Sequence, residues 1–194
     1  EWIFKDESDY DVLVYMLEDT IYHRDEKNYH DVIRDLGGDG IMIESGAGIS
    51  PPYESIYEYM GLEKWATEQY KNLHEFNKLL RAAEKKVKRA LPSAADGPAE
   101  VVSCGSISGY YGPQQFKKYV LPFYKEHLPF LHSKGKICLV HGHSSRLKCI
   151  KDLIPQTGLD VIEAFTPPPV GDLSLSEARD VWSDNIIIWV NLPE

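Results

Sequence analysis

The sequence has no uninterrupted apolar run of about 18 residues, the length that a membrane-spanning helix needs. Its first ten residues, EWIFKDESDY, lack the basic and apolar segments of a secretory signal peptide. Only 3 cysteines occur in 194 residues, an odd number at wide spacing that does not resemble the disulfide framework of a secreted protein. These absences predict a protein without a membrane span that resides in the reducing cytoplasm.

Positive charge is also scarce. Lys and Arg number 21 against 30 Asp and Glu, for a net charge of −9. Nucleic-acid binding needs a basic surface that neutralises phosphates, and the densest basic stretch, KKVKRA (85–90), fits the C-terminal end of a helix instead. No Gly-x-Gly-x-x-Gly pattern follows a predicted strand, which disfavours a dinucleotide site. We therefore expect a small-molecule substrate and no nucleic-acid partner.

What the sequence does contain is a series of short apolar, β-branched runs bounded by Gly, Pro, Asp or Asn. Such runs are typical of buried strands. They lie at 40–45, 99–105, 136–142, 159–165 and 185–191.

Helical patterns occupy the intervals between these runs. They cover residues 8–20, 27–39, 74–91, 112–135 and 174–182. Pro122 and Pro129 are expected to kink or divide the fourth helix, and Ser174 with Glu177 forms a capping box at the start of the fifth. Alternation of strands and helices predicts an α/β fold with a parallel sheet.

The length raises a question about this sheet. A closed (β/α)8 barrel of the TIM type usually needs about 250 residues, and only about five βα units are visible. The alternatives are a sheet that stays open and a partial barrel, and we favour the partial barrel, with residues 1–194 as one domain.

Polar or titratable residues stand at the end of every predicted strand. Because the carboxyl ends of parallel strands meet at one edge of a sheet, they indicate an active site there. The residues are Glu44, Cys104, His141 with His143, Glu163 and Asn191.

His141 and His143 are the centre of this predicted site. Residues i and i+2 of a strand share a face, so both imidazoles can point into the mouth of a barrel and bind zinc. The third ligand stays open between Glu44, Glu163 and Cys104. The alternative is that one histidine bonds a substrate or a loop carbonyl and no metal binds.

The other candidates also have two interpretations each. Glu163 is a catalytic acid or base, a metal ligand or a partner of His141, or else a cap for the next loop. Glu44 contacts substrate or stabilises a loop, and Cys104 is a substrate contact or a small residue at a crowded strand end. Tyr110, in the segment GYYG (109–112), lines a substrate pocket or belongs, with the tyrosine-rich segment 51–61, to a lid that packs on itself.

Two long segments carry a family resemblance. YYGPQQFKKYVLPFYKEHLPFLHSKGKICLVHGHS and GLDVIEAFTPPPVGDLSLSEARDVWSDNIIIWVNLP resemble the C-terminal two-thirds of the uroporphyrinogen decarboxylase family. The match is good over about residues 98–193 and extends more loosely to 35–52. This resemblance implies a TIM barrel, of which the chain is the C-terminal part, and a possible homodimer.

Members of the family catalyse two types of reaction, methyl transfer and decarboxylation, and the resemblance implies one of them. Its corrinoid-linked methyltransferases hold zinc through a His-x-Cys pair and a later Cys. His141-Gly142-His143 stands where His-x-Cys lies, with His in place of Cys. We expect a zinc-dependent methyltransferase that works with a corrinoid-carrying partner protein. The alternatives are a cofactor-free decarboxylase of tetrapyrrole carboxylates, whose Arg-rich N-terminal segment is absent from this sequence, and a non-catalytic binding fragment.

Overall fold

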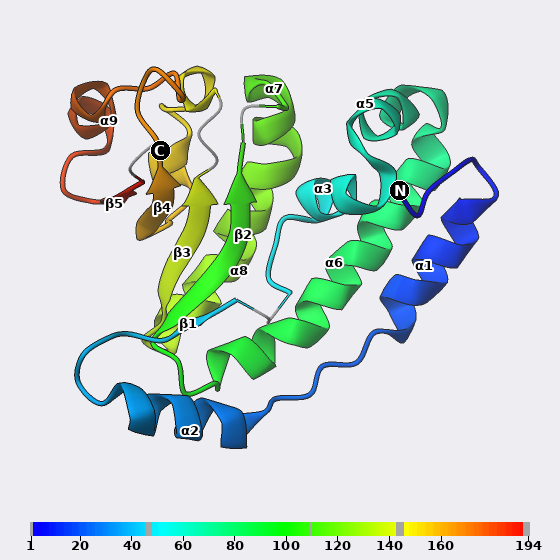
Figure 1. Ribbon diagram of the computed structural model, residues 1–194. Coiled ribbons are helices and arrows are strands. Elements are labelled where there is room, and N and C mark those ends of the chain that lie inside the picture. The colour runs from blue at the N-terminus through cyan, green and yellow to red at the C-terminus, as the bar shows by residue number, and fades with distance from the viewer. Residues whose placement is uncertain (1, 46–47, 109, 143–145, 192–194) are drawn as a thin grey trace.

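The computed structural model describes residues 2–45, 48–108, 110–142 and 146–191, which form a mixed α/β fold (Figure 1). Its five-stranded sheet is parallel, and the strand order follows the chain, β1-β2-β3-β4-β5. The strands are β1 (Ile43–Glu44), β2 (Val101–Ile107), β3 (Ile137–Gly142), β4 (Val161–Phe165) and β5 (Ile187–Val190). All five predicted strands are confirmed, although β1 is reduced to two residues.

The main core lies between this sheet and the helices behind it. Alternate strand residues, among them Val102, Cys138, Val140 and Ile162, are fully buried there. The helix α8 (Leu121–Ser133) covers this face of the sheet (Figure 1). We call the face of the sheet that α8 covers the helix face, and the opposite face the inner face.

The longest helix, α6 (Leu73–Ala95), joins the sheet region to the N-terminal helix α1 (Asp9–Asp19), which runs alongside it (Figure 1). Buried residues recur along α6 at the spacing of a helical stripe. Two polar pairs tie α6 to α8: His127 Nε2 lies 2.8 Å from Glu84 Oε1, and Lys88 Nζ lies 2.9 Å from Glu126 Oε1.

The predicted helix over 112–135 is divided, as its prolines indicate. It consists of α7 (Pro113–Gln115), a π-helical turn η1 (Phe116–Val120) and α8. Pro122 follows this turn by two residues, and it has no N–H to continue an α-helical ladder. Pro129, in contrast, lies within α8 without ending it.

The tyrosine-rich segment contains helices that the sequence patterns did not predict. They are α3 (Pro52–Ser55), α4 (Tyr57–Met60) and α5 (Leu62–Lys71). Tyr53 and Ile56 are fully buried, and the ring of Tyr53 stacks on Tyr119 of η1 with 4.4 Å between centroids. This segment is therefore part of the core as well as a wall of the site described below.

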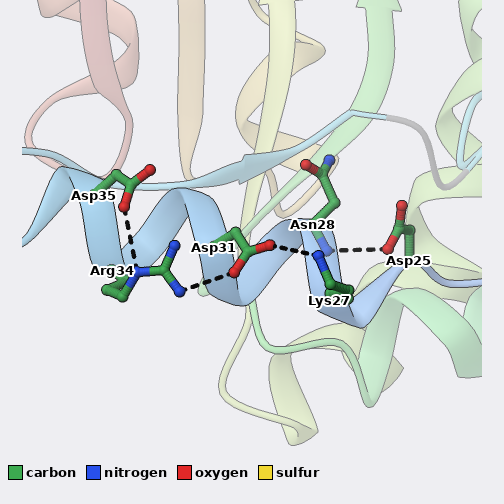
Figure 2. A network of polar contacts seen from close by, with 6 residues as sticks. All are labelled: Asp25, Lys27, Asn28, Asp31, Arg34 and Asp35. Atoms are coloured by element: carbon green, nitrogen blue, oxygen red, sulfur yellow. Dashed lines mark hydrogen bonds and ion pairs between the residues drawn. The ribbon is translucent and has the colours of Figure 1, made fainter.

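The helix α2 (Glu26–Leu36) has no fully buried residue. Figure 2 shows its surface network, in which Asp31 pairs with both Lys27 and Arg34 at 2.9 Å. Asp25 caps the helix by accepting a hydrogen bond from the Asn28 N–H, and Gly37 ends it. Exposed pairs of this kind contribute little stability each, so we interpret the network as a solvated helix surface.

β2 departs from regular pairing with β3. Ser103 is opposite Leu139 and Ser106 is opposite His141, so one extra residue is inserted into β2 between these pairs. Gly105 has a φ of 86° in this bulge, and a side chain there would meet Ser50 at less than 3 Å. Glycine is therefore required at this position.

In the described residues the sheet is open, with β1 and β5 as its edges, so a closed barrel is not seen. A thin apolar layer of Val101, Leu139 and Val161 covers the N-terminal part of the inner face. At the β5 edge, Ile187 and Trp189 are exposed. None of the described helices is long and apolar enough to cross a membrane.

The last helix, α9 (Leu175–Trp182), has the predicted capping box. Ser174 Oγ accepts from the Glu177 N–H, and Glu177 Oε2 accepts from the Ser174 N–H. We expect Ser174→Ala to lower the free energy of unfolding by about 1 kcal/mol, measured by urea denaturation, because it leaves a helix N–H without its acceptor. Asp180→Ala, at an exposed position within the helix, is the control, and an equal loss of stability in both variants would contradict the cap assignment.

Candidate functional site

Strand register places a group of polar side chains on the inner face, near the C-terminal ends of the strands. His141 of β3 is directly paired with Glu163 of β4. Both follow the apolar layer of Leu139 and Val161 by one step of the period-2 alternation. On β2, Ser103 lies on the same face and lines the same pocket as His141. The inner face thus changes from apolar to polar where parallel sheets build their sites.

The contact between His141 and Glu163 is the most specific feature of this site. His141 Nδ1 lies 2.6 Å from Glu163 Oε2, and the two side chains are 43% and 31% exposed. A carboxylate that accepts from Nδ1–H fixes the tautomer and the orientation of the ring, which is the arrangement in which histidines act as metal ligands or general bases. His143, the predicted second ligand, lies outside the described residues.

A pocket of about 350 Å³ opens beside His141. Its wall includes Ser50, Glu54, Glu58, Ser103, Ser106 and His141. None of the described residues that line it is Lys or Arg, so the charge of its wall comes from the carboxyl groups. The pocket can therefore hold a small ligand in contact with the imidazole, and its wall also contains Glu54 and Glu58.

Glu54 is a residue of this site that the sequence patterns missed. Ser106 Oγ donates to its Oε1 at 3.0 Å, whereas its Oε2 is shielded from solvent and has no hydrogen-bond partner among the described residues. Burial raises the pKa of Glu54 to about 8. At neutral pH the group is therefore mostly a neutral acid that can donate a proton or a hydrogen bond. In the sequence it stands just after Pro51-Pro52, within the tyrosine-rich segment 51–61, for which a substrate wall and a lid were the two interpretations.

Glu44 does not lie with His141 and Glu163, which corrects the expectation that the strand-end residues converge. In β1 it alternates with Ile43, whose side chain packs on the inner apolar layer, so Glu44 points to the opposite face. There it lines a separate cavity of about 320 Å³ with Arg24 and Ser93. Burial raises its pKa, and the charge of Arg24 opposes that shift.

Cys104 is also on the helix face, for the same reason of alternation. It is fully buried in the main core, and its thiol lies 3.6 Å from the carbonyl oxygen of Val102. The neighbouring Cys138 thiol and burial raise its pKa well above the usual value. Cys104 therefore does not line the pocket beside His141.

Tyr110 and Asn191 lie in different surroundings. Tyr110, the predicted substrate contact, is exposed. It lines a small pocket together with Glu54 and Ser106. Asn191 follows β5, and its N–H donates to the carbonyl of Phe165 at 2.8 Å. Its side chain is exposed and does not belong to the lining of the pocket beside His141.

The described residues contain two other groups of potential metal ligands, and both already serve the fold. His132 Nε2 lies 2.9 Å from Asp160 Oδ2, which also accepts from the Cys138 N–H at 2.7 Å. This network joins α8, β3 and β4. The second group, Glu84, Glu126 and His127, is the α6–α8 contact described above.

Comparison with known proteins gives one clear finding, which concerns the fold. No protein-family model matches the chain, and no curated protein sequence does. Among solved structures, a methyltransferase from Methanosarcina mazei is similar, with a TM-score of 0.61 at 11% sequence identity. The similarity covers 92% of this chain and 47% of that protein, so the chain spans about half its length. At this identity the chain shares a fold with that methyltransferase.

Proposed function

We propose that this chain is the site-bearing part of a TIM-barrel methyltransferase of the uroporphyrinogen decarboxylase-like type. The observation that carries the proposal is the contact between His141 and Glu163 on the inner face, beside a pocket. The sequential order of the parallel strands supports a barrel, because that is the order in which a (β/α)8 barrel closes. The shared fold with a methyltransferase supports the reaction class.

The residues around His141 fit a zinc ion in part. Imidazole is a good zinc ligand, and a carboxylate on its second nitrogen is the usual outer partner of a zinc-bound histidine. We propose His141 as a ligand, with His143 as the second, and Glu163 as the residue that orients His141. When bound, zinc would supply a Lewis acid that activates a thiol or a methyl-bearing substrate. A corrinoid-carrying protein is the proposed methyl partner, and a homodimer the proposed assembly.

The charge of the pocket disfavours the decarboxylase alternative. A substrate with several carboxylates needs cationic partners. The described wall of the pocket has no Lys or Arg, and its acidic residues are Glu54 and Glu58. A cation or a neutral molecule suits this wall better than a polyanion does.

Zinc analysis tests the proposal. We expect about one zinc per chain in protein purified without chelator, and its loss from the His141→Ala/His143→Ala double variant. Glu163→Gln should weaken zinc binding by about 10- to 100-fold, because the imidazole loses its orienting partner. Elemental analysis and chelator competition measure both.

His132→Ala is the matched control, since this histidine also contacts a carboxylate but lies in the α8–β3–β4 network. It should keep the zinc. Metal-free wild-type protein, or zinc that is lost only from the His132 variant, would refute the proposed site.

A further inference from the structure

A second, smaller pocket adjoins the one beside His141. It measures about 80 Å³, and four of its lining residues are aromatic: Tyr57, Trp65, Tyr110 and Tyr111. The ring centroids of Tyr57 and Trp65 are 6.0 Å apart with the planes at 80°, and those of Trp65 and Tyr111 are 6.1 Å apart at 61°. Rings that meet at steep angles enclose a space on several sides, as the walls of a box do.

The polar atoms of two of these aromatic residues have partners in the protein. The Trp65 Nε1–H donates to the Tyr53 carbonyl at 2.7 Å, and the Tyr111 hydroxyl accepts from the Ser108 N–H at 3.4 Å. Both side chains are 3% exposed, so they are held firmly. These two residues therefore present mainly aromatic surface, whose π-faces carry partial negative charge.

The remaining wall of this pocket is acidic. Glu54 and Glu58 both line it, and none of its described lining residues is Lys or Arg. Glu54 Oε2 is buried without a hydrogen-bond partner among the described residues. A buried oxygen of this kind is unfavourable unless a ligand compensates it. The pocket thus combines π-faces with a buried carboxyl oxygen that has no hydrogen-bond partner among the described residues.

We propose that this aromatic pocket binds a small organic cation of the methylated-ammonium class. Such a cation is weakly hydrated, and it is attracted both by the faces of Trp and Tyr and by a carboxylate. An inorganic divalent cation would need six or more oxygen ligands, which a wall of rings does not provide.

The inference deepens the proposed function, on which its catalytic meaning rests, by naming a substrate class. Glu54, Glu58 and Ser106 line both pockets, so the aromatic pocket continues into the one that His141 lines. In methyl transfer from such a donor the N–CH3 bond breaks and its electron pair stays on nitrogen. The methyl carbon would bond to a thiolate or to a reduced corrinoid carried by the proposed partner protein, and the amine would leave neutral without a proton transfer.

Binding is coupled to the protonation of Glu54. The groups that face it are Ser106 from β2, Glu58 from α4, and the phenols of Tyr111 and Tyr124. Burial holds the pKa of Glu54 at about 8, so below that pH a bound cation must displace its proton. Affinity should therefore rise with pH by up to about tenfold per unit until about pH 8, and then level off.

Calorimetric titration of the full chain tests the proposal with choline and its neutral carbon isostere, 3,3-dimethyl-1-butanol. We expect choline to bind at least about tenfold more tightly than the isostere above about pH 8. Glu54→Gln should weaken choline binding by about tenfold and remove most of its pH dependence, while binding of the isostere stays unchanged. Glu63→Gln is the matched control, because Glu63 is exposed on α5 and does not line the pocket.

Equal affinity for choline and the isostere, or no choline binding by folded wild-type protein between about pH 6 and about pH 9, overturns the proposal. So does an effect of Glu63→Gln as large as that of Glu54→Gln. The His141→Ala/His143→Ala variant separates the two proposals, since it should lose zinc and still bind choline. Choline binding without zinc would refute only the metal site, and zinc without choline binding only the aromatic pocket.

Discussion

The Gly142→Ala variant is expected to unfold with about 1–3 kcal/mol less free energy than the wild type, and to bind zinc more weakly. A methyl group at this position would lie 2.5 Å from Ile162 Cγ2 and 3.2 Å from the carbonyl oxygen of Glu163. Ile162 is fully buried and cannot move aside without disturbing the core. The strands β3 and β4 must therefore separate at the level of the site.

The separation should displace His141 from Glu163. In the wild type, His141 Nδ1 lies 2.6 Å from Glu163 Oε2. Urea denaturation gives the loss of stability, and chelator competition gives the loss of zinc affinity. Gly38→Ala is the control, since a side chain there meets no atom within 4 Å. A Gly142→Ala protein with wild-type stability would show that the close packing of β3 on β4 is not required.

Removing the buried carboxyl of Glu54 is expected to change how stability depends on pH. Its pKa is about 8 in the folded chain, against an ordinary value of 4.5. Between these values the folded state keeps a proton that the unfolded state has released, so stability falls as pH rises. The contribution is fully present below about pH 4.5 and is lost as pH rises through about 8.

From about pH 6 to about pH 9 the wild type should lose about 3 kcal/mol more stability than Glu54→Gln, which stays neutral and can still accept from Ser106. Urea denaturation at a series of pH values measures the difference. Glu63→Gln should follow the wild type. Parallel pH profiles for the wild type and Glu54→Gln would mean that Glu54 is ionised in the folded state.

The strands and most helices were predictable because their patterns are local. Apolar runs between turn residues mark the strands, and the Ser174–Glu177 box marks the start of α9. In both cases a few neighbouring residues carry the whole signal. The contact of Glu163 with His141 was one of several alternatives that their positions at two consecutive strand ends left open.

The faces of the strand ends could not be predicted in the same way. Glu44 and Cys104 are near the right edge of the sheet but on the helix face, because one step along a strand reverses the direction of a side chain. Knowing that a residue ends a strand is not enough without the register. Glu54 was missed because its importance depends on contact with Ser106, which is 52 positions away in the chain.

The bulge in β2 shifts by one residue the alternation of side chains between the two faces of the sheet. Before it, Val101 and Ser103 lie on the inner face, at odd positions. After it, Ser106 and Ser108 line the pockets, at even positions, while Ile107 is fully buried in the main core. Deleting a single residue at 104–105 would therefore exchange the environments of Ile107 and its two serine neighbours. The hydroxyl that holds Glu54 owes its position to one added residue, so a one-residue change in length here alters the ligand pocket without a substitution of Ser106 itself.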